Sequence, residues 1–213
     1  FAQVAIDGIQ KVVSEAGYEL KLCEKYGTDL DRVKRVAADV DAMIIRSDKV
    51  GGEIMDAAPG LKIIVRAGAG YDNVDLEAAT ARNICVMNTP GQNSNAVAEL
   101  AFGMMVMAVR NFYNGTSGSE LMGKKLGIHA YGNVGRNVAR IAKGFGMEIY
   151  AFDAYCPKEL IEADGVIPVD SPEALYETCN VVSIHIPATP GTRMSINYNL
   201  LGRMPKNGLI VNT

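Results

Sequence analysis

Residues 125–136 read Lys-Leu-Gly-Ile-His-Ala-Tyr-Gly-Asn-Val-Gly-Arg. An apolar run predicts a strand over 125–129, and a glycine-rich turn leads from it into an amphipathic helix over 134–144. A strand, a turn of this kind and a helix, in this order, are typical of a parallel α/β sheet that binds phosphate groups at the turn.

The turn has the pattern AxGxxG, and each of its small residues has a physical reason. Ala130 is small enough for the tight bend, and Gly132 lets the backbone approach a pyrophosphate. Gly135 lets the helix pack against the strand. The N–H groups near Asn133 and Val134 open the helix and face the phosphates, where the helix dipole favours negative charge. The alternative is an ordinary turn whose glycines serve packing only.

An acidic residue at the end of the next strand supports the dinucleotide interpretation. Asp153 follows the apolar run 147–152 and stands 18 residues after Gly135. A carboxylate at this place accepts hydrogen bonds from the hydroxyls of the adenosine ribose and repels a 2′-phosphate. The sequence therefore predicts NAD, in preference to NADP, as the cofactor.

Helices and strands alternate along the rest of the chain. Further strands are predicted at 18–22, 41–45, 61–66, 84–87, 181–185 and 208–212. Further helices are predicted at 6–17, 30–37, 54–58, 76–81, 93–110, 158–163, 172–178 and 198–204. Apolar strands between helices imply parallel sheets that are covered on both faces. The break at 88–93 predicts two units, over residues 1–90 and 91–213.

Composition limits the function classes. Hydrophobic residues make up 48% of the 213 residues and charged residues 21%, which is an ordinary globular balance. The net charge of −3 and the lack of a basic run argue against a nucleic-acid protein. Apolar runs such as 181–184 are too short to span a bilayer, so no membrane partner is expected.

Four scattered cysteines, Cys23, Cys85, Cys156 and Cys179, form no CxxC pair and stand at no metal-ligand spacing from a histidine. A disulfide framework or a metal site is therefore not expected. Reduced, mostly buried thiols in a cytoplasmic protein are the expectation.

Several separate segments resemble the D-isomer-specific 2-hydroxyacid dehydrogenase family, in the right order. They are Val-Arg-Ala-Gly-Ala-Gly-Tyr-Asp-Asn-Val-Asp at 65–75, Asn-Thr-Pro-Gly at 88–91 with Val-Ala-Glu-Leu at 97–100, the stretch 126–136, and His-Ile-Pro at 185–187. The resemblance covers essentially the whole chain. It implies two doubly wound α/β units, a flavodoxin-like substrate-binding domain and a Rossmann NAD-binding domain, both truncated.

The resemblance implies a set of NAD contacts in the second unit. With the turn residues they are Ala130, Gly132, Asn133, Val134, Gly135, Asp153, His185, Ile186, Pro187 and Thr213. His185 ends a strand that lines the cofactor crevice, and a role as proton carrier is the less favoured interpretation. His129 is expected to be buried and hydrogen-bonded.

The resemblance also implies a substrate site in the first unit, for a phosphorylated hydroxy acid. The substrate carboxylate would meet backbone N–H groups near Ala69 and Gly70. The phosphate would meet Arg46 and Ser47, with Lys49 and Asn93 as further candidates. The alternative for Arg46 is a surface salt bridge.

The catalytic residues of the family are an Arg, a Glu and a His, all expected beyond Thr213, so no catalytic residue is expected within this chain. By resemblance, the helix 93–110 is an element of a homodimer formed through the NAD-binding domain. Its methionines could equally belong to the core.

Resemblance favours the branch of the family that oxidises 3-phospho-D-glycerate. Two alternatives stay open. The first is a family member that acts on another acid, of the glyoxylate, lactate or formate type. The second is a non-catalytic NAD-sensing scaffold or corepressor with the same fold.

Overall fold

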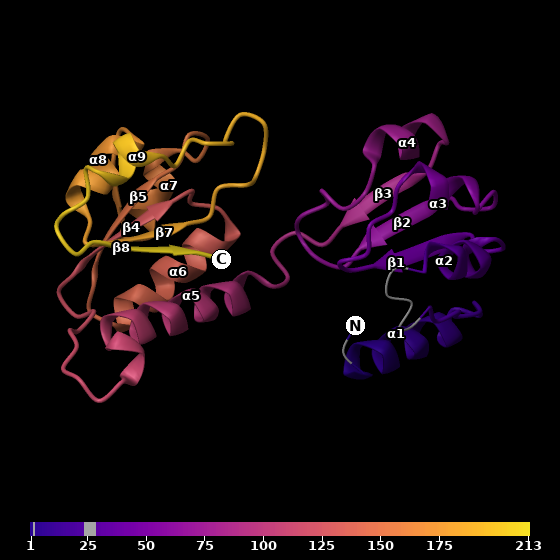
Figure 1. Ribbon diagram of the computed structural model, residues 1–213, viewed down its shortest axis with the longest axis horizontal. Helices are drawn as coiled ribbons and strands as arrows, with labels where there is room; N and C mark the ends of the chain where they lie inside the picture. The colour runs from indigo at the N-terminus through magenta and orange to yellow at the C-terminus, as the bar shows by residue number, and fades with distance from the viewer. Residues whose placement is uncertain (2, 24–28) are drawn as a thin grey trace. The chain divides into compact units, whose positions relative to one another are not determined.

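The computed structural model describes residues 1, 3–23 and 29–213 and divides the chain into two compact units (Figure 1). The first unit is Phe1–Gln92 and the second is Asn93–Thr213. Each has its own parallel sheet and its own hydrophobic core.

The first unit is built on a three-stranded parallel sheet in the order β1-β2-β3. Its strands are β1 (Ala42–Ile45), β2 (Ile63–Arg66) and β3 (Cys85–Asn88). The register places Ile45 beside Arg66 and Arg66 beside Asn88, so all three strands end at one edge of the sheet. The loops that follow these strands therefore begin side by side.

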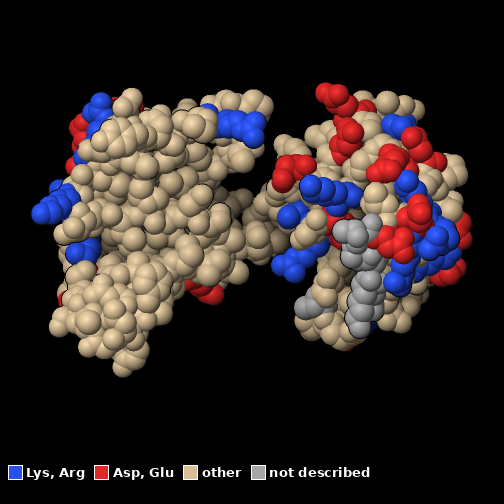
Figure 2. Space-filling view, in the orientation of Figure 1, with Lys and Arg blue, Asp and Glu red and all other residues tan. Residues whose placement is uncertain are grey.

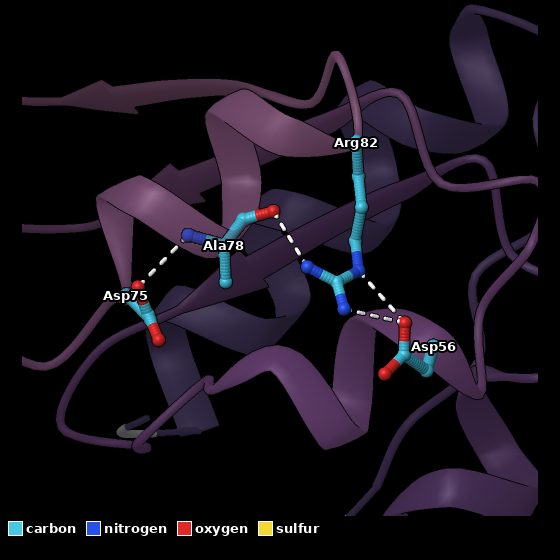
Figure 3. Close-up of polar contacts among 4 residues, drawn as sticks. All are labelled: Asp56, Asp75, Ala78 and Arg82. Carbon is cyan, nitrogen blue, oxygen red and sulfur yellow. Dashed lines mark hydrogen bonds and ion pairs between the residues drawn. The ribbon is translucent and has the colours of Figure 1, made fainter.

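The described residues of the first unit form four helices, which are α1 (Gln3–Glu15), α2 (Leu30–Ala37), α3 (Gly52–Asp56) and α4 (Leu76–Ala81). The Asp75 side chain caps α4 by accepting a hydrogen bond from the Ala78 N–H at 2.9 Å. Arg82 ties α4 to α3, because its guanidinium pairs with Asp56 and also donates to the Ala78 carbonyl (Figure 3).

The two faces of this sheet differ. Ile45 and Ile64 lie on the face that packs on the core of the unit. On the opposite face Ile44 is 43% exposed, Met87 is 50% exposed and Cys85 is exposed. The expectation of mostly buried thiols is therefore wrong, since only Cys179 is buried among the four free cysteines.

The second unit contains a five-stranded parallel sheet in the order β6-β5-β4-β7-β8. The strands are β4 (Lys125–His129), β5 (Glu148–Phe152), β6 (Ile167–Pro168), β7 (Val181–Ile184) and β8 (Leu209–Asn212). The chain begins this sheet at β4, adds β5 and β6 on one side of it, and then adds β7 and β8 on the other side. The chain reverses its direction of winding between β4 and β7, where ligands bind in open α/β sheets.

Helices cover both faces of the second sheet. The helical elements are α5 (Ser94–Val109), the 3-10 turn η1 (Asn111–Tyr113), α6 (Asn133–Gly144), α7 (Lys158–Ala163), α8 (Pro172–Thr178) and α9 (Tyr198–Leu201). Side chains of α5, α6 and α7 pack with Leu126 and Ile128 in one core cluster. Those of α8 and α9 pack with Val182 and Ile184 in another, so the sheet is wound on both sides.

The α/β class with two parallel units is confirmed, and several elements differ from the sequence-based expectation. Residues 18–22 form no strand, and Tyr18 is 75% exposed; an apolar run needs a neighbouring strand, and none pairs with it in the described part of the chain. The short β6 was not expected, and α9 ends at Leu201 instead of residue 204.

Within residues 1, 3–23 and 29–213, no helix is long and apolar enough to cross a membrane.

Candidate functional site

The turn after β4 is a strained bend held by the neighbouring strand. Ala130 has φ +81°, a left-handed conformation that favours glycine. Its N–H donates to the Phe152 carbonyl at 2.8 Å, and the next N–H, of Tyr131, donates to Asp153 Oδ2 at 2.6 Å. The turn is therefore fixed to the carboxyl end of β5 by two consecutive N–H groups.

The two glycines of the turn have different surroundings. A Cβ on Gly135 would lie 2.4 Å from the Ala130 carbonyl oxygen and 3.0 Å from Ile128 Cγ2, so the helix packs directly on the bend. A Cβ on Gly132 would meet nothing within 4 Å. Gly132 precedes α6 as its N-cap and has no side chain to cover the first N–H groups of the helix, which include those of Asn133 and Val134. An exposed helix N-terminus with open space in front of it fits a pyrophosphate.

Asp153 is an acceptor for three backbone donors. Besides Tyr131, Oδ1 accepts from the N–H groups of Tyr155 and Cys156 at 2.8 and 2.9 Å. Burial by itself would raise the pKa of this carboxyl, but the three N–H groups and His129 outweigh it and hold the pKa below its ordinary value. Asp153 is thus an anion at neutral pH. It anchors the turn after β4, and its side chain is partly exposed at the sheet edge.

The two histidines lie at the ends of β4 and β7. His129 is buried, as expected, with Nδ1 3.3 Å from the hydroxyl of Tyr176, and burial lowers its pKa. His185 Nε2 lies 2.8 Å from Ser183 Oγ, and burial lowers the pKa of His185 to about 4. His185 is therefore neutral at pH 7 and is not a cationic ligand for phosphate.

The predicted cofactor residues of the second unit gather at one sheet edge. Ala130 follows β4, Asp153 follows β5, and His185, Ile186 and Pro187 follow β7. Thr213 follows β8, whose Asn212 is in register with Ile184. Because the strands are parallel, these carboxyl ends line the edge where the winding reverses.

A second loop, after β2, offers free backbone donors. The loop of residues 67–70 is held by the Asn88 side chain, which donates to the Ala69 carbonyl at 2.7 Å, and by the Thr89 N–H, which donates to the Gly68 carbonyl at 2.9 Å. Neither the Ala69 N–H nor the Gly70 N–H donates a hydrogen bond to an atom of the described residues. Two exposed, adjacent and unpaired N–H groups suit a carboxylate.

The segment after β1 lies beside this loop. Asn73 Nδ2 donates to the carbonyls of Arg46 and Asp48, at 3.3 and 2.7 Å, and Val50 forms a bridge with Val74. Arg46, Ser47 and Lys49 are exposed. In the described part of the chain no salt bridge involves Arg46, so the expected alternative role in a surface ion pair is not seen.

Asn93 belongs to the second unit, where it precedes α5 without a side-chain capping bond. Its contact with a substrate bound at the first unit stays a prediction.

Other candidate features lie away from these sites. Among the described residues no group of three or more His, Cys, Asp or Glu side chains could hold a metal ion. A hollow of about 350 Å³ is lined by the end of α5, residues 117–119 and residues 207–209. It borders the start of β8, at the edge of the sheet opposite the phosphate turn.

Comparison with known proteins agrees with this geometry. The sequence model of the catalytic domain of D-isomer specific 2-hydroxyacid dehydrogenases matches residues 2–203. The chain belongs to this family. The resemblance inferred from the motifs is confirmed.

Individual members of the family are similar over most of the chain. A D-3-phosphoglycerate dehydrogenase of Methanocaldococcus jannaschii is 40% identical over 197 residues, which cover 86% of this chain and 37% of that protein. A hydroxypyruvate reductase of Thermotoga maritima is 36% identical and is covered over 63% of its length. The chain therefore spans less than two thirds of the curated relatives that it matches.

Solved 2-hydroxyacid dehydrogenases share the fold. An NAD+-bound 3-phosphoglycerate dehydrogenase of Entamoeba histolytica superimposes with a TM-score of 0.91 at 43% identity, over 100% of this chain and 68% of that one. A D-lactate dehydrogenase of Escherichia coli gives a TM-score of 0.83 at 30% identity, over 100% of this chain and 71% of that one.

Sequence reasoning missed the side chains that hold the two loops. Asn88 and Asn73 bond carbonyls 19 and 25 to 27 residues away. The one signal for Asn88 was its place just after a predicted strand at the edge where the site forms.

Proposed function

We propose that the protein is an NAD-dependent dehydrogenase that oxidises 3-phospho-D-glycerate to 3-phosphohydroxypyruvate, the first step of serine biosynthesis. The observation that carries this proposal is the pair of adjacent anion sites in the first unit. Among the described residues nothing pairs with the N–H groups of Ala69 and Gly70 or with the guanidinium of Arg46. Asn73, three residues after Gly70, binds the carbonyls of Arg46 and Asp48 and so holds the segment of Arg46 near the loop. A substrate with a carboxylate at one end and a phosphate at the other matches this arrangement. Relatives that bear the name D-3-phosphoglycerate dehydrogenase support it.

The binding of substrate is divided between backbone and side chains. The N–H groups of Ala69 and Gly70 hold the carboxylate, whereas Arg46, Ser47 and Lys49 contact the phosphate, with Asn93 as a further contact. Holding both ends fixes which hydrogen of C2 faces the cofactor, and this orientation is a large part of what a dehydrogenase contributes.

The cofactor-binding edge is formed by the second unit. When bound, NAD supplies the acceptor for the hydride. Gly132, Asn133, Val134 and Gly135 receive the pyrophosphate at the start of α6, with Ala130 making the bend. Asp153 accepts hydrogen bonds from the ribose hydroxyls, and its negative charge disfavours the 2′-phosphate of NADP. His185, Ile186, Pro187 and Thr213 line the rest of the edge.

Proton transfer requires groups outside these sites. We place the catalytic Arg, Glu and His after Thr213, since neither described histidine is suited to the task. His129 is buried against Tyr176, and His185 is held by Ser183 with a pKa of about 4.

The test is an assay of the full-length protein with NAD and 3-phospho-D-glycerate, beside D-lactate, D-glycerate and malate. Arg46→Ala is expected to raise KM for the phosphorylated acid by roughly 10- to 100-fold, because a charge-assisted contact is lost. The same variant should leave turnover of an unphosphorylated acid nearly unchanged.

Equal loss with all acids would contradict the phosphate role of Arg46. Turnover of unphosphorylated acids alone would favour a different substrate. The similarity to a hydroxypyruvate reductase supports this alternative. Binding of NADH without turnover of any acid would favour the scaffold or corepressor.

We further propose a cytoplasmic homodimer formed through the second unit. Leu100, Val106 and Met107 of α5 are 57%, 36% and 43% exposed, and Phe112 and Tyr113 follow at 73% and 82%. Figure 2 shows that this side of the unit carries few charged side chains over α5 and the loop after it. An exposed apolar surface of this extent is typical of a protein interface.

A further inference from the structure

A second hollow, of about 300 Å³, lies along α6, and we refer to it as the α6 hollow. It is lined by Tyr131 of the turn after β4, by residues of α6 and by Asp164, which follows α7. The charged residues that α6 contributes are Arg136, Arg140 and Lys143. Their spacing of four and then three residues places them on one face of the helix, over roughly 10 Å of its length.

The α6 hollow extends away from the edge of the sheet where the cofactor residues gather. Lys143 lies shortly before β5, and Asp164 lies shortly before β6. Because β5 and β6 are parallel, both begin at the edge opposite to the one where Asp153 follows β5. The N–H groups of Asn133 and Val134 open the other end of α6. A ligand in the α6 hollow is therefore separate from a pyrophosphate at the start of the helix.

The cations of the α6 hollow have no acidic partner. Helix α6 contains no Asp or Glu, and none of the ion pairs among the described residues involves its arginines or its lysine. Like charges three or four residues apart on one helix face repel each other and destabilise the helix. A bound anion would remove this repulsion.

Both arginines are held in place by uncharged groups, which leave their positive charge uncompensated. The guanidinium carbon of Arg136 lies 5.8 Å from the centre of the Tyr131 ring, in a cation–π contact. Arg140 Nη2 donates to Asn95 Oδ1 at 2.6 Å and to Asn137 Oδ1 at 3.4 Å. These contacts restrict the two side chains before any ligand binds, which lowers the entropy lost on binding.

Among the described residues that line the α6 hollow, Asp164 is the one carboxylate. Its Oδ2 atom accepts a hydrogen bond from the Tyr131 hydroxyl at 3.2 Å, and its backbone carbonyl accepts one from the Lys143 ammonium. This carboxylate offsets one of the three positive charges of α6. The lining therefore keeps an excess of positive charge.

We infer that the α6 hollow binds a small anion that contains a chain of phosphoryl groups, held by Arg136, Arg140 and Lys143. A row of cations about 10 Å long matches a chain of phosphoryl groups better than it matches a single carboxylate or phosphate. The planar guanidinium groups bind phosphate oxygens in pairs, and the ammonium adds a point charge. The inference goes beyond the proposed function, since it concerns a site separate from those of the cofactor and the substrate.

The experiment is isothermal titration calorimetry of the full-length protein with tripolyphosphate, at a constant ionic strength of about 0.15 M. Saturating NADH is present throughout, because NADH fills the pyrophosphate site at the start of α6. The wild type should bind one tripolyphosphate per chain. The double variant R136Q/R140Q should bind it more weakly by roughly 10- to 100-fold, because charge-assisted hydrogen bonds are lost.

Two control variants separate this site from a general effect of charge. R110Q/K206Q also removes two exposed cations of the second unit, neither of which lines the α6 hollow, and should change the affinity by no more than about twofold. D164N removes the negative charge of the lining and keeps an acceptor for the Tyr131 hydroxyl. It should strengthen binding by about three- to tenfold, since a repulsion is lost.

The source of the phosphoryl chain is distinguished by a titration with ATP under the same conditions. ATP should bind with an affinity comparable to that of tripolyphosphate, because the cations contact only the phosphoryl chain. Binding of ATP without binding of tripolyphosphate would overturn the inference, since the nucleoside would then be the group that is recognised.

Equal weakening in R136Q/R140Q and R110Q/K206Q would also overturn the inference, because binding would then follow only the net charge of the protein. An unchanged affinity in R136Q/R140Q would do the same. Thermal unfolding should show R136Q/R140Q to be at least as stable as the wild type, because the repulsion within α6 is reduced. If it is less stable, D164N decides the question, and an unchanged or weaker affinity in D164N would contradict the site.

Discussion

Gly132 and Gly135 stand three residues apart in one turn, and the structure separates what each contributes. We predict that Gly135→Ala destabilises the second unit by about 1–3 kcal/mol, because the new Cβ overlaps the Ala130 carbonyl oxygen. We predict that Gly132→Ala leaves stability within about 0.5 kcal/mol, since its Cβ enters open space.

For cofactor binding the order should be reversed, with Gly132→Ala affected more than Gly135→Ala. Gly132→Ala should weaken NADH binding by at least about tenfold, as expected when a charge-assisted hydrogen bond is lost. Chemical denaturation and NADH fluorescence titration of both variants measure the two effects. A stable Gly132→Ala protein with unchanged NADH affinity would show that no phosphate approaches this residue.

At the residue scale, the pattern AxGxxG was sufficient to locate the turn, but it could not give the conformation of Ala130. A small residue was expected there for its size. The structure shows that the position also needs φ +81°, which costs an alanine roughly 1 kcal/mol relative to glycine. This cost arises from the tight turn between β4 and α6, and the residue type at position 130 does not by itself reveal the conformation of the turn.

At the scale of an element, β7 ends in a pH-sensitive pair formed by Ser183 and His185. Burial lowers the pKa of His185 from 6.5 to about 4, so between these pH values the unfolded chain binds a proton that the native chain does not. Native stability contributed by the neutral imidazole is therefore complete above about pH 6.5 and falls as the pH is lowered towards 4.

We predict that His185→Gln flattens this decline by up to about 3 kcal/mol between pH 7 and pH 4.5. The remaining slope belongs in part to His129, whose pKa burial also lowers. Urea denaturation of the wild type and the variant at several pH values measures it. Parallel curves for the two proteins over this range would refute the assignment to His185.

Elements with strong local signals were predicted well, and those that depend on neighbours were not. Strand β4 and helices α4, α7 and α8 have the predicted bounds, because an apolar period and a capping or breaking residue mark each of them. The two-residue β6 has no period of its own and exists because it pairs with β5. Residues 18–22 have the apolar period but no neighbouring strand.

The hydrogen bonds that shape the candidate sites could not be predicted from the sequence, because they too depend on neighbouring parts of the fold. Asn88, Asn73 and Asp153 each act on a backbone group between 2 and 27 residues away, and only the fold decides which group that is.

At the scale of the whole molecule, the proposed dimer gives a direct test of α5. Leu100→Lys places a charge on the exposed apolar surface and should raise the dimer dissociation constant by at least about 100-fold. The matched control is Leu160→Lys on α7, because Leu160 is 47% exposed and Leu100 is 57% exposed.

Sedimentation velocity of the full-length protein over a range of concentrations distinguishes the outcomes. Leu160→Lys should sediment like the wild type. A wild type that is monomeric at every concentration, or a Leu100→Lys variant that stays dimeric, would contradict the proposed interface.

The N–H groups of Ala69 and Gly70, which donate to no atom of the described residues, have a consequence for how new specificities could arise. A backbone donor is present in every residue type except proline, so most substitutions at residue 69 leave it in place, whereas any substitution of Arg46 removes its guanidinium. A gene library randomised at 46, 47 and 49 would therefore vary the distal end of the acceptable acid and leave the binding of its carboxylate intact. Directed evolution towards unphosphorylated acids should find its first improved clones among these three codons.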